Sequence, residues 1–245
     1  LMQLSCDLWG PVIIPSPHGL RYCILVIDHH THFMWVRFMK TKDESCALLE
    51  SILLEIKHIH AKHHAQTTAF SHVLKFDSDT VFEAAETQSM CAKLGVGTQF
   101  SAPYAHHMLG KAERPWRTIR DCAAASMHTM SVPTSMWSCA MSTVVHLRNR
   151  TFSRAVGTCG GVPLTLLTFA SPDASGFRVF GCAAFAKVPD AQRKKLDPKS
   201  FRGIFVGYPP NSPGYRIYNP ATRRITTSVH VVFQEDVSGF GKCLN

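Results

Sequence analysis

Residues 4–9 read Leu4-Ser5-Cys6-Asp7-Leu8-Trp9, a strand-forming run with one acid inside it. A Gly10-Pro11 turn signal follows, and residues 22–27 and 33–39 form two more runs rich in β-branched and aromatic side chains. Consecutive strands with short connections pair in an antiparallel manner. We therefore predict three antiparallel strands, the first of which carries Asp7.

The period of the apolar residues becomes helical after residue 43. Apolar side chains recur every three or four positions at Leu48, Leu49, Ile52, Leu53, Ile56 and Ile59. This spacing predicts a long amphipathic helix, for which Thr41 and Asp43 are candidate caps.

The middle of the chain alternates between the two periods. Short apolar runs predict strands at residues 73–76 and 97–101, with a helix over residues 81–94 between them. Two further helices are predicted at residues 112–130 and 133–150. The predicted order is βββαβαβαα, which is a mixed α/β domain.

The last third of the chain has a different pattern. Residues 157–176 are rich in Gly, Thr, Ser and Pro and predict a linker. Beyond them, short β-type runs separated by Pro and Gly turns are typical of a small barrel or curled sheet. A chain of 245 residues is long enough for two such parts. We predict a first domain over residues 1–156, the linker over 157–176, a small β domain over 177–236 and a tail over 237–245.

The charge of the chain points to a polyanionic partner. The net charge is +9, and nucleic acid is the commonest partner of a basic domain. Residues 187–224 hold nine basic and two acidic side chains, so most of the excess lies in the small domain. No run approaches the roughly 18 apolar residues that a membrane span needs, and we expect no membrane partner. The nine cysteines include no CxxC pair, which disfavours a zinc or redox motif.

Three acidic residues fall where the predicted elements meet. Asp7 lies on the first strand, Asp77 follows the fourth, and Glu113 begins the helix after the fifth. If the first and fourth strands are neighbours, the aspartates lie side by side and the helix carries Glu113 over them. Such a carboxylate cluster suits Mg²⁺, which prefers oxygen ligands. The residue types alone leave a second interpretation open, that of three solvated surface charges.

The spacing and the flanking residues are more specific than the acids. Thirty-five residues separate Asp77 from Glu113, a spacing characteristic of the retroviral integrase and transposase superfamily. The sequence resembles copia-type retrotransposon integrases over nearly its whole length. The matching stretches are Asp7-Leu8-Trp9-Gly10-Pro11, Phe76-Asp77-Ser78, Ser101-Ala102-Pro103-Tyr104, Gly110-Lys111-Ala112-Glu113-Arg114, Arg148-Asn149-Arg150-Thr151, Arg178-Val179-Phe180-Gly181-Cys182, Lys195-Leu196-Asp197-Pro198-Lys199-Ser200, Gly203-Ile204-Phe205-Val206-Gly207-Tyr208 and Gly214-Tyr215-Arg216-Ile217-Tyr218.

The resemblance implies a fold and an activity. The fold is an RNase H-like core, a mixed five-stranded sheet flanked by helices, followed by a small SH3-like β-barrel. The activity is that of an integrase, a polynucleotidyl transferase in which Asp7, Asp77 and Glu113 are catalytic and hold two Mg²⁺ or Mn²⁺ ions. One ion activates the attacking water or DNA 3′ hydroxyl, and the other stabilises the leaving 3′ oxygen.

The resemblance also implies partners and a place of action. The partners are the DNA of the element ends and of the target, further copies of the chain, and other parts of a Pol polyprotein. The polyprotein is made in the cytoplasm, and integration takes place in the nucleus.

Two groups of basic residues are candidates for contact with the DNA backbone. The first follows the helix of Glu113 at i+3 spacing, which forms a row able to track phosphates. The second lies in the small domain. A solvated face is the alternative for both groups. Their members are Lys111, Arg114, Arg117 and Arg120 on the helix, and Lys194, Lys195, Lys199 and Arg202 in the small domain.

Two loops depart from the family pattern. After Asp77 the chain has Ser78-Asp79-Thr80-Val81-Phe82, where family members usually have Asn-Gly-Gly-Glu-Phe. Before Glu113 it has Ala105-His106-His107-Met108-Leu109-Gly110, where they commonly have Thr-Pro-Gln-Gln-Asn-Gly. Pro115 is expected in the first turn of its helix, since deeper it removes a backbone hydrogen bond. Two alternatives stay open: a decayed or domesticated copy that binds DNA or RNA without chemistry, and an RNase H-like nuclease.

Histidines and one further acid need separate interpretation. The histidines form two groups, His29, His30 and His32 in one and His58, His60, His63 and His64 in the other. No Cys is close to either group in the sequence, so solvated or partly buried histidines are favoured over a zinc site. Asp28 aligns with another acid of the family pattern, and we interpret it as a structural residue at a strand end.

Overall fold

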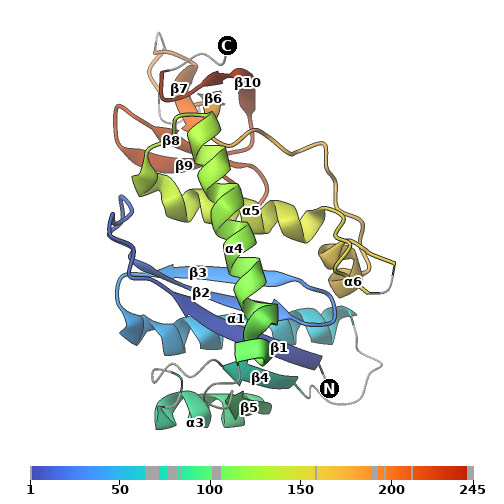
Figure 1. Ribbon diagram of the computed structural model, residues 1–245. Helices are drawn as coiled ribbons and strands as arrows, with labels where there is room; N and C mark the ends of the chain where they lie inside the picture. The colour runs from blue at the N-terminus through green and yellow to red at the C-terminus, as the bar shows by residue number, and fades with distance from the viewer. Residues whose placement is uncertain are drawn as a thin grey trace. The chain divides into compact units, whose positions relative to one another are not determined.

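The fold was obtained as a computed structural model, in which the elements form two sheets with helices around them (Figure 1). The structure describes residues 2–63, 72–76, 82, 84–100, 106–157, 159–188, 193–195, 197–210 and 212–241, with only the backbone at residue 2 and at residues 106–113. The chain divides into two compact units, Leu1–Thr118 with Leu147–Ala174 and Ile119–His146 with Ser175–Asn245. No helix in the described part of the chain is long and apolar enough to cross a membrane.

The sheet of the first unit has five strands in the order β3-β2-β1-β4-β5. Strand β1 pairs antiparallel with β2 and parallel with β4, and β2 pairs antiparallel with β3. The predicted antiparallel start of the chain is confirmed, and the first and fourth strands are neighbours, which was the condition set for the acid cluster. The strands are β1 (Met2–Trp9), β2 (Tyr22–Asp28), β3 (Met34–Met39), β4 (His72–Phe76) and β5 (Val96–Phe100).

Alternation along β1 separates the two faces of this sheet. Leu4 and Cys6 are buried in a core that includes Leu49 and Ile52 of α1 (Ser45–His63) and Cys91 of α3 (Ala85–Leu94). The predicted helical stripe is therefore the buried side of α1. The opposite face of β1 lies under α4 (His106–Thr129), and Figure 1 shows α1 and α4 on opposite sides of the sheet.

Two local expectations were wrong. Helix α4 begins at His106, so Pro115 lies inside the helix and not in its first turn. The segment predicted to be a loop contains a short helix, α6 (Pro163–Thr168). Its cause is local: Val162 is extended, Pro163 supplies a φ already suited to the first helical position, and the side chains of Pro163 and Leu167 are buried.

The side chain of Asn149 is hydrogen-bonded to the edge strand of the first sheet. Asn149 lies near the end of α5 (Trp137–Arg150), and its side chain is buried. Its Oδ1 accepts the backbone N–H of Met34 at 2.9 Å, and its Nδ2 donates to the carbonyl of Met34 at 2.7 Å. The end of α5 is thus fixed against the start of β3.

The sheet of the second unit is antiparallel throughout, in the order β10-β6-β7-β8-β9. Residues 130–143 pack closely on it at two glycines. A Cβ on Gly181 would lie 2.5 Å from Val132, and a Cβ on Gly207 would lie 2.5 Å from Thr143 Oγ1, and both glycines have positive φ. The strands are β6 (Cys182–Lys187), β7 (Ser200–Phe205), β8 (Tyr215–Asn219), β9 (Arg224–Ser228) and β10 (Val231–Ser238).

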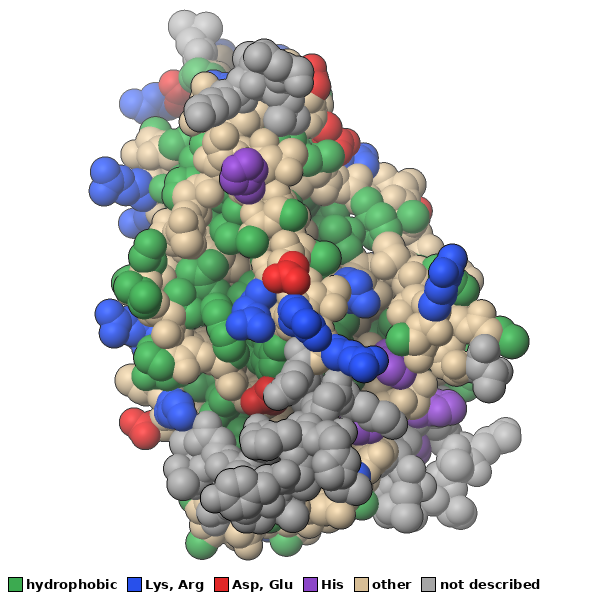
Figure 2. Space-filling view, viewed as in Figure 1, with side chains coloured by type: hydrophobic (Ala, Val, Ile, Leu, Met, Phe, Trp, Pro, Cys, Tyr) green, Lys and Arg blue, Asp and Glu red, His purple; other side chains and the backbone are tan. Residues whose placement is uncertain are grey.

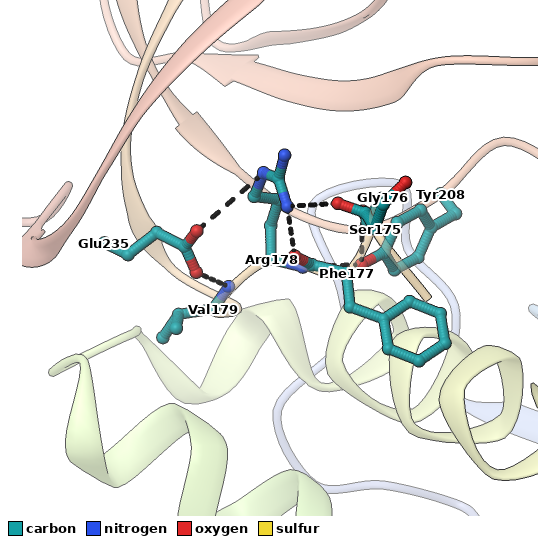
Figure 3. Close-up of polar contacts among 7 residues, drawn as sticks. All are labelled: Ser175, Gly176, Phe177, Arg178, Val179, Tyr208 and Glu235. Carbon is teal, nitrogen blue, oxygen red and sulfur yellow. Dashed lines mark hydrogen bonds and ion pairs between the residues drawn. The ribbon is translucent and has the colours of Figure 1, made fainter. Parts of the chain in front are cut away.

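Arg178 organises the segment that enters this second sheet (Figure 3). Its guanidinium Nη1 donates to the carbonyls of Ser175 and Phe177, at 2.8 and 2.5 Å. The guanidinium carbon Cζ lies 5.2 Å from the ring centroid of Phe233. Its Nε is 3.8 Å from Glu235, which also accepts the N–H of Val179. Arg178 is therefore a structural cation within the second unit.

Candidate functional site

Asp7 is the described member of the predicted acid cluster. It is half-buried on β1 and shares its face with Ser5 and Trp9, opposite the side of Cys6. Burial, followed by the charge of Asp7, raises the pKa of the Cys6 thiol, and the same two causes raise the pKa of Cys23. Both thiols therefore stay protonated near neutral pH and are poor nucleophiles.

The register of β1 and β4 bears on Asp77, which lies outside the described residues. Phe76, the residue before Asp77, is paired with Cys6, the residue before Asp7, in the parallel ladder. The described part of β4 therefore ends level with the position of Asp7. That level ending is the arrangement that the sequence prediction requires.

Glu113 lies in α4, and its side chain is outside the described residues. Trp116, one turn later on the same helix, is buried and packs against Trp9, with ring centroids 6.1 Å apart. Because Trp9 lies two residues from Asp7 and Trp116 three residues from Glu113, this contact holds the turn of Glu113 over the strand of Asp7.

Asp28 has a structural role. Its carboxylate is buried and accepts hydrogen bonds from the backbone N–H groups of His30 and Thr31 and from the hydroxyl of Thr31. These three bonds fix the turn between β2 and β3. Among the described residues, no group of three or more His, Cys, Asp and Glu side chains is placed to hold a metal ion. Neither Asp77 nor the side chain of Glu113 belongs to that set.

The structure describes the side chains of most members of the two predicted basic groups. On α4, Arg114, Arg117 and Arg120 are exposed, while the side chain of Lys111 is not described. Figure 2 shows Lys and Arg side chains gathered over α4, with His side chains beside them. In the second unit, the predicted DNA-contacting residues are all exposed, namely Lys194, Lys195, Lys199 and Arg202.

The comparisons with known proteins identify the region. A family model described as the retroviral polymerase SH3-like domain matches residues 182–243. The retrovirus-related Pol polyprotein from transposon TNT 1-94 of Nicotiana tabacum is 32% identical over 229 residues, which are 94% of this chain and 17% of that protein. The chain is an integrase-like region of a retrotransposon Pol polyprotein.

A second relative and a solved structure are also similar to this integrase-like region. The Pol polyprotein from transposon RE1 of Arabidopsis thaliana is 26% identical over 244 residues, which are all of this chain and 16% of that protein. The chain thus spans about a sixth of the length of these polyproteins. The simian T-cell lymphotropic virus intasome, solved in complex with PP2A regulatory subunit B56 gamma, shares its fold with a TM-score of 0.51 and 14% identity, over 93% of this chain and 78% of that one.

The fold expected of an integrase-like region is confirmed, a mixed five-stranded sheet with helices followed by an antiparallel SH3-like sheet. Trp9 and Trp116, whose contact joins β1 to α4, were not among the predicted site residues. A signal was present, because each tryptophan follows a predicted metal ligand at the spacing that returns to the same face of its element. Arg216, one of the nine basic residues of segment 187–224, is half-buried. Burial raises the pKa of the Cys139 thiol, and the charge of Arg216 opposes that rise.

Proposed function

We propose that this region joins the 3′ ends of element DNA to target DNA, as copia-type integrases do, and that it acts in the nucleus after synthesis within a polyprotein. The observation that carries the proposal is the pair of contacts around β1: the ladder that ends β4 level with Asp7, and the Trp9–Trp116 packing that holds α4 over the same strand. Asp77 directly follows the last residue of β4, and Glu113 lies three residues before Trp116 on α4.

The donor set fits two Mg²⁺ or Mn²⁺ ions. Three carboxylates offer hard oxygen ligands, and Asp7 is half-buried, so it is accessible on the α4 side of the sheet. Asp7, Asp77 and Glu113 would hold the ions. When bound, the ions supply the positive charge that stabilises an in-line phosphodiester displacement.

The protein's own part is to bind and orient DNA. The exposed arginines of α4 follow one another at i+3 spacing from the turn of Glu113, so a strand held along them passes the acids. Lys194, Lys195, Lys199 and Arg202 provide a second basic surface for the same polyanion. These contacts set affinity and register without reading bases. We further propose that several copies act together on paired DNA ends.

A second candidate function is a copy that binds DNA without chemistry. It is favoured by the two altered loops, in which Thr80 stands where the family has Gly, and Met108 and Leu109 stand where it has Gln and Asn. The side chain added at Thr80 and the amides lost at positions 108 and 109 should weaken binding of a DNA end more than they weaken binding of a metal ion. This candidate predicts binding of DNA together with low or absent joining.

A joining assay separates the candidates. Labelled donor DNA is incubated with the chain and target DNA in Mg²⁺ or Mn²⁺. Products larger than the donor indicate strand transfer, shortened products indicate a nuclease, and intact DNA with a shifted mobility indicates the binding module. Asp7→Asn should abolish transfer, while Asp121→Asn, an exposed acid on the same helix as Glu113, serves as the control.

The loops themselves can be tested by restoration. The variant Thr80→Gly with Met108→Gln and Leu109→Asn should join more DNA than the natural chain if the loops are the defect. Equal joining by both chains would show that the loop differences are neutral and would remove the case for a decayed copy.

A further inference from the structure

A cleft in the first unit brings together two arginines and two histidines from three separate elements. It has a volume of about 600 Å³, and its walls include His29 and His32 from the turn after β2, Arg114 from α4 and Arg148 from α5. No Asp or Glu is among the described residues that line it. The described lining therefore favours an anion over a cation.

The two arginines of the cleft carry charge that is not neutralised locally. Arg114 is exposed and Arg148 is half-exposed. In the part of the chain that the structure describes, neither guanidinium has a carboxylate within ion-pair distance. Arginine favours phosphate because its planar fork can donate two hydrogen bonds to the oxygens of one group.

Hydrogen bonds and packing fix the elements that line the cleft. Asn149, the neighbour of Arg148, is clamped to Met34 by two hydrogen bonds. Asp28 fixes the turn that presents His32, and the ring nitrogen Nε2 of His29 lies 2.6 Å from Ser5 Oγ. A site whose walls are fixed in advance loses little entropy when a ligand binds.

The position of the cleft decides what kind of anion it takes. Ser5 lies two residues from Asp7 on the same face of β1, and Arg114 directly follows Glu113. Arg114 is also a member of the exposed row on α4, so the cleft continues that row toward the turn after β2. A free phosphate has no need of this continuity, whereas a polynucleotide strand follows it.

We propose that the cleft binds a backbone phosphodiester of DNA, held by Arg114 and Arg148, and so anchors the strand beside the acids. His29 and His32 complete the wall from the side of the β2–β3 turn. The inference rests on the proposed function and adds to it a subsite in which Arg148 of α5 joins Arg114 of the α4 row.

The test is DNA binding by the whole chain, measured by fluorescence anisotropy with a labelled duplex over a series of salt concentrations. The cleft variant is Arg114→Gln with Arg148→Gln. The matched control is Arg21→Gln with Lys62→Gln, which removes the same charge from exposed positions outside the cleft. Thermal unfolding of each variant shows that it is folded.

The cleft variant should bind about tenfold more weakly than the natural chain, and the slope of log K against log salt should fall by about one. The control variant should lose clearly less affinity for DNA than the cleft variant loses. A scan with DNA that carries a neutral methylphosphonate at one position should find a site where the substitution weakens binding by the natural chain but not by the cleft variant.

Equal losses in the two variants, or a methylphosphonate scan that affects the natural chain and the cleft variant alike, would overturn the subsite and leave the proposed function standing. A natural chain that binds no duplex at low salt would overturn both. Competition by inorganic phosphate at concentrations comparable to that of the DNA would show that the cleft takes a small anion, which also contradicts the proposal.

Discussion

Trp9 and Trp116 pack with their ring centroids 6.1 Å apart and their planes tilted by 33°. One ring belongs to the strand of Asp7 and the other to the helix of Glu113. A hydrophobic contact therefore joins the strand that carries Asp7 to the helix that carries Glu113. Stability and activity should depend on this pair together.

Trp116→Ala should lower the free energy of unfolding by about 3 to 5 kcal/mol, because the side chain is buried and leaves a cavity. Trp116→Phe should cost less, since the indole Nε1 has no hydrogen-bond partner among the described residues and only packing is lost. Urea denaturation followed by circular dichroism measures both. In a cycle with Trp9→Leu, a coupling of about 0.5 to 1.5 kcal/mol is expected. Strictly additive effects would contradict the proposed link between strand and helix.

Mg²⁺ or Mn²⁺ should raise the melting temperature of the natural chain, because an ion that binds only the folded state stabilises it. Asp7→Asn and Glu113→Gln should each reduce this rise, since each removes a ligand charge. In EDTA the same variants should melt at the same temperature as the natural chain or higher, because neutralising one acid relieves repulsion between neighbouring carboxylates. Asp121→Asn is the control, and an equal loss of ion response there would refute the assignment of the ligands.

His72 should make the protein less stable in acid. Burial, followed by the charge of His60, lowers the pKa of His72 from 6.5 to about 4. The unfolded chain therefore takes up this proton below about pH 6.5, while the folded chain resists it until about pH 4. Stability should fall across that window by up to about 3 kcal/mol.

The measurement is urea denaturation at several pH values between 7 and 4. His72→Phe should flatten the profile in this window, and His128→Gln, an exposed substitution, should leave the profile as it is. A natural chain whose stability does not change between pH 6.5 and 4.5 would rule out a strongly lowered pKa for His72.

Arg178→Lys should destabilise the second unit by about 1 to 2 kcal/mol. Lysine keeps the charge but loses the fork that donates to Ser175 and Phe177. Glu235→Gln should cost less, because the ion pair is long and its side chains are 29% and 40% exposed, and because Gln still accepts the N–H of Val179. Thermal unfolding ranks the two variants. A larger cost for Glu235→Gln would mean that the ion pair matters more than the carbonyl contacts.

Much of the first sheet was predictable because its pattern is local. Leu4 and Cys6 alternate with other residues along β1, and Leu49 and Ile52 recur at helical spacing along α1. Both patterns mark the side of the element that is buried in the core. The adjacency of β1 and β4 was a condition for Asp7 and Asp77 to lie side by side, and the parallel ladder meets that condition.

The start of α4 could not be predicted, because Pro115 argued for a helix that begins just before it. Tertiary contacts compete with this local preference, and buried Trp116 is the example next to the proline. The basic cleft could not be predicted either. Its arginines are 34 positions apart, as their numbers 114 and 148 show, and only the folding of α5 onto β3 through Asn149 brings them to one surface.

Strand β3 is an edge of its sheet, and an edge is a template on which another chain can add a strand. At Met34 the backbone N–H and C=O are already hydrogen-bonded to the side chain of Asn149, because a carboxamide offers the same donor and acceptor as a peptide group. The side chain of Asn149 therefore makes the two hydrogen bonds that one residue of an added strand would make. This position of the edge is therefore not available for pairing with another strand, whether or not a copy retains its chemistry.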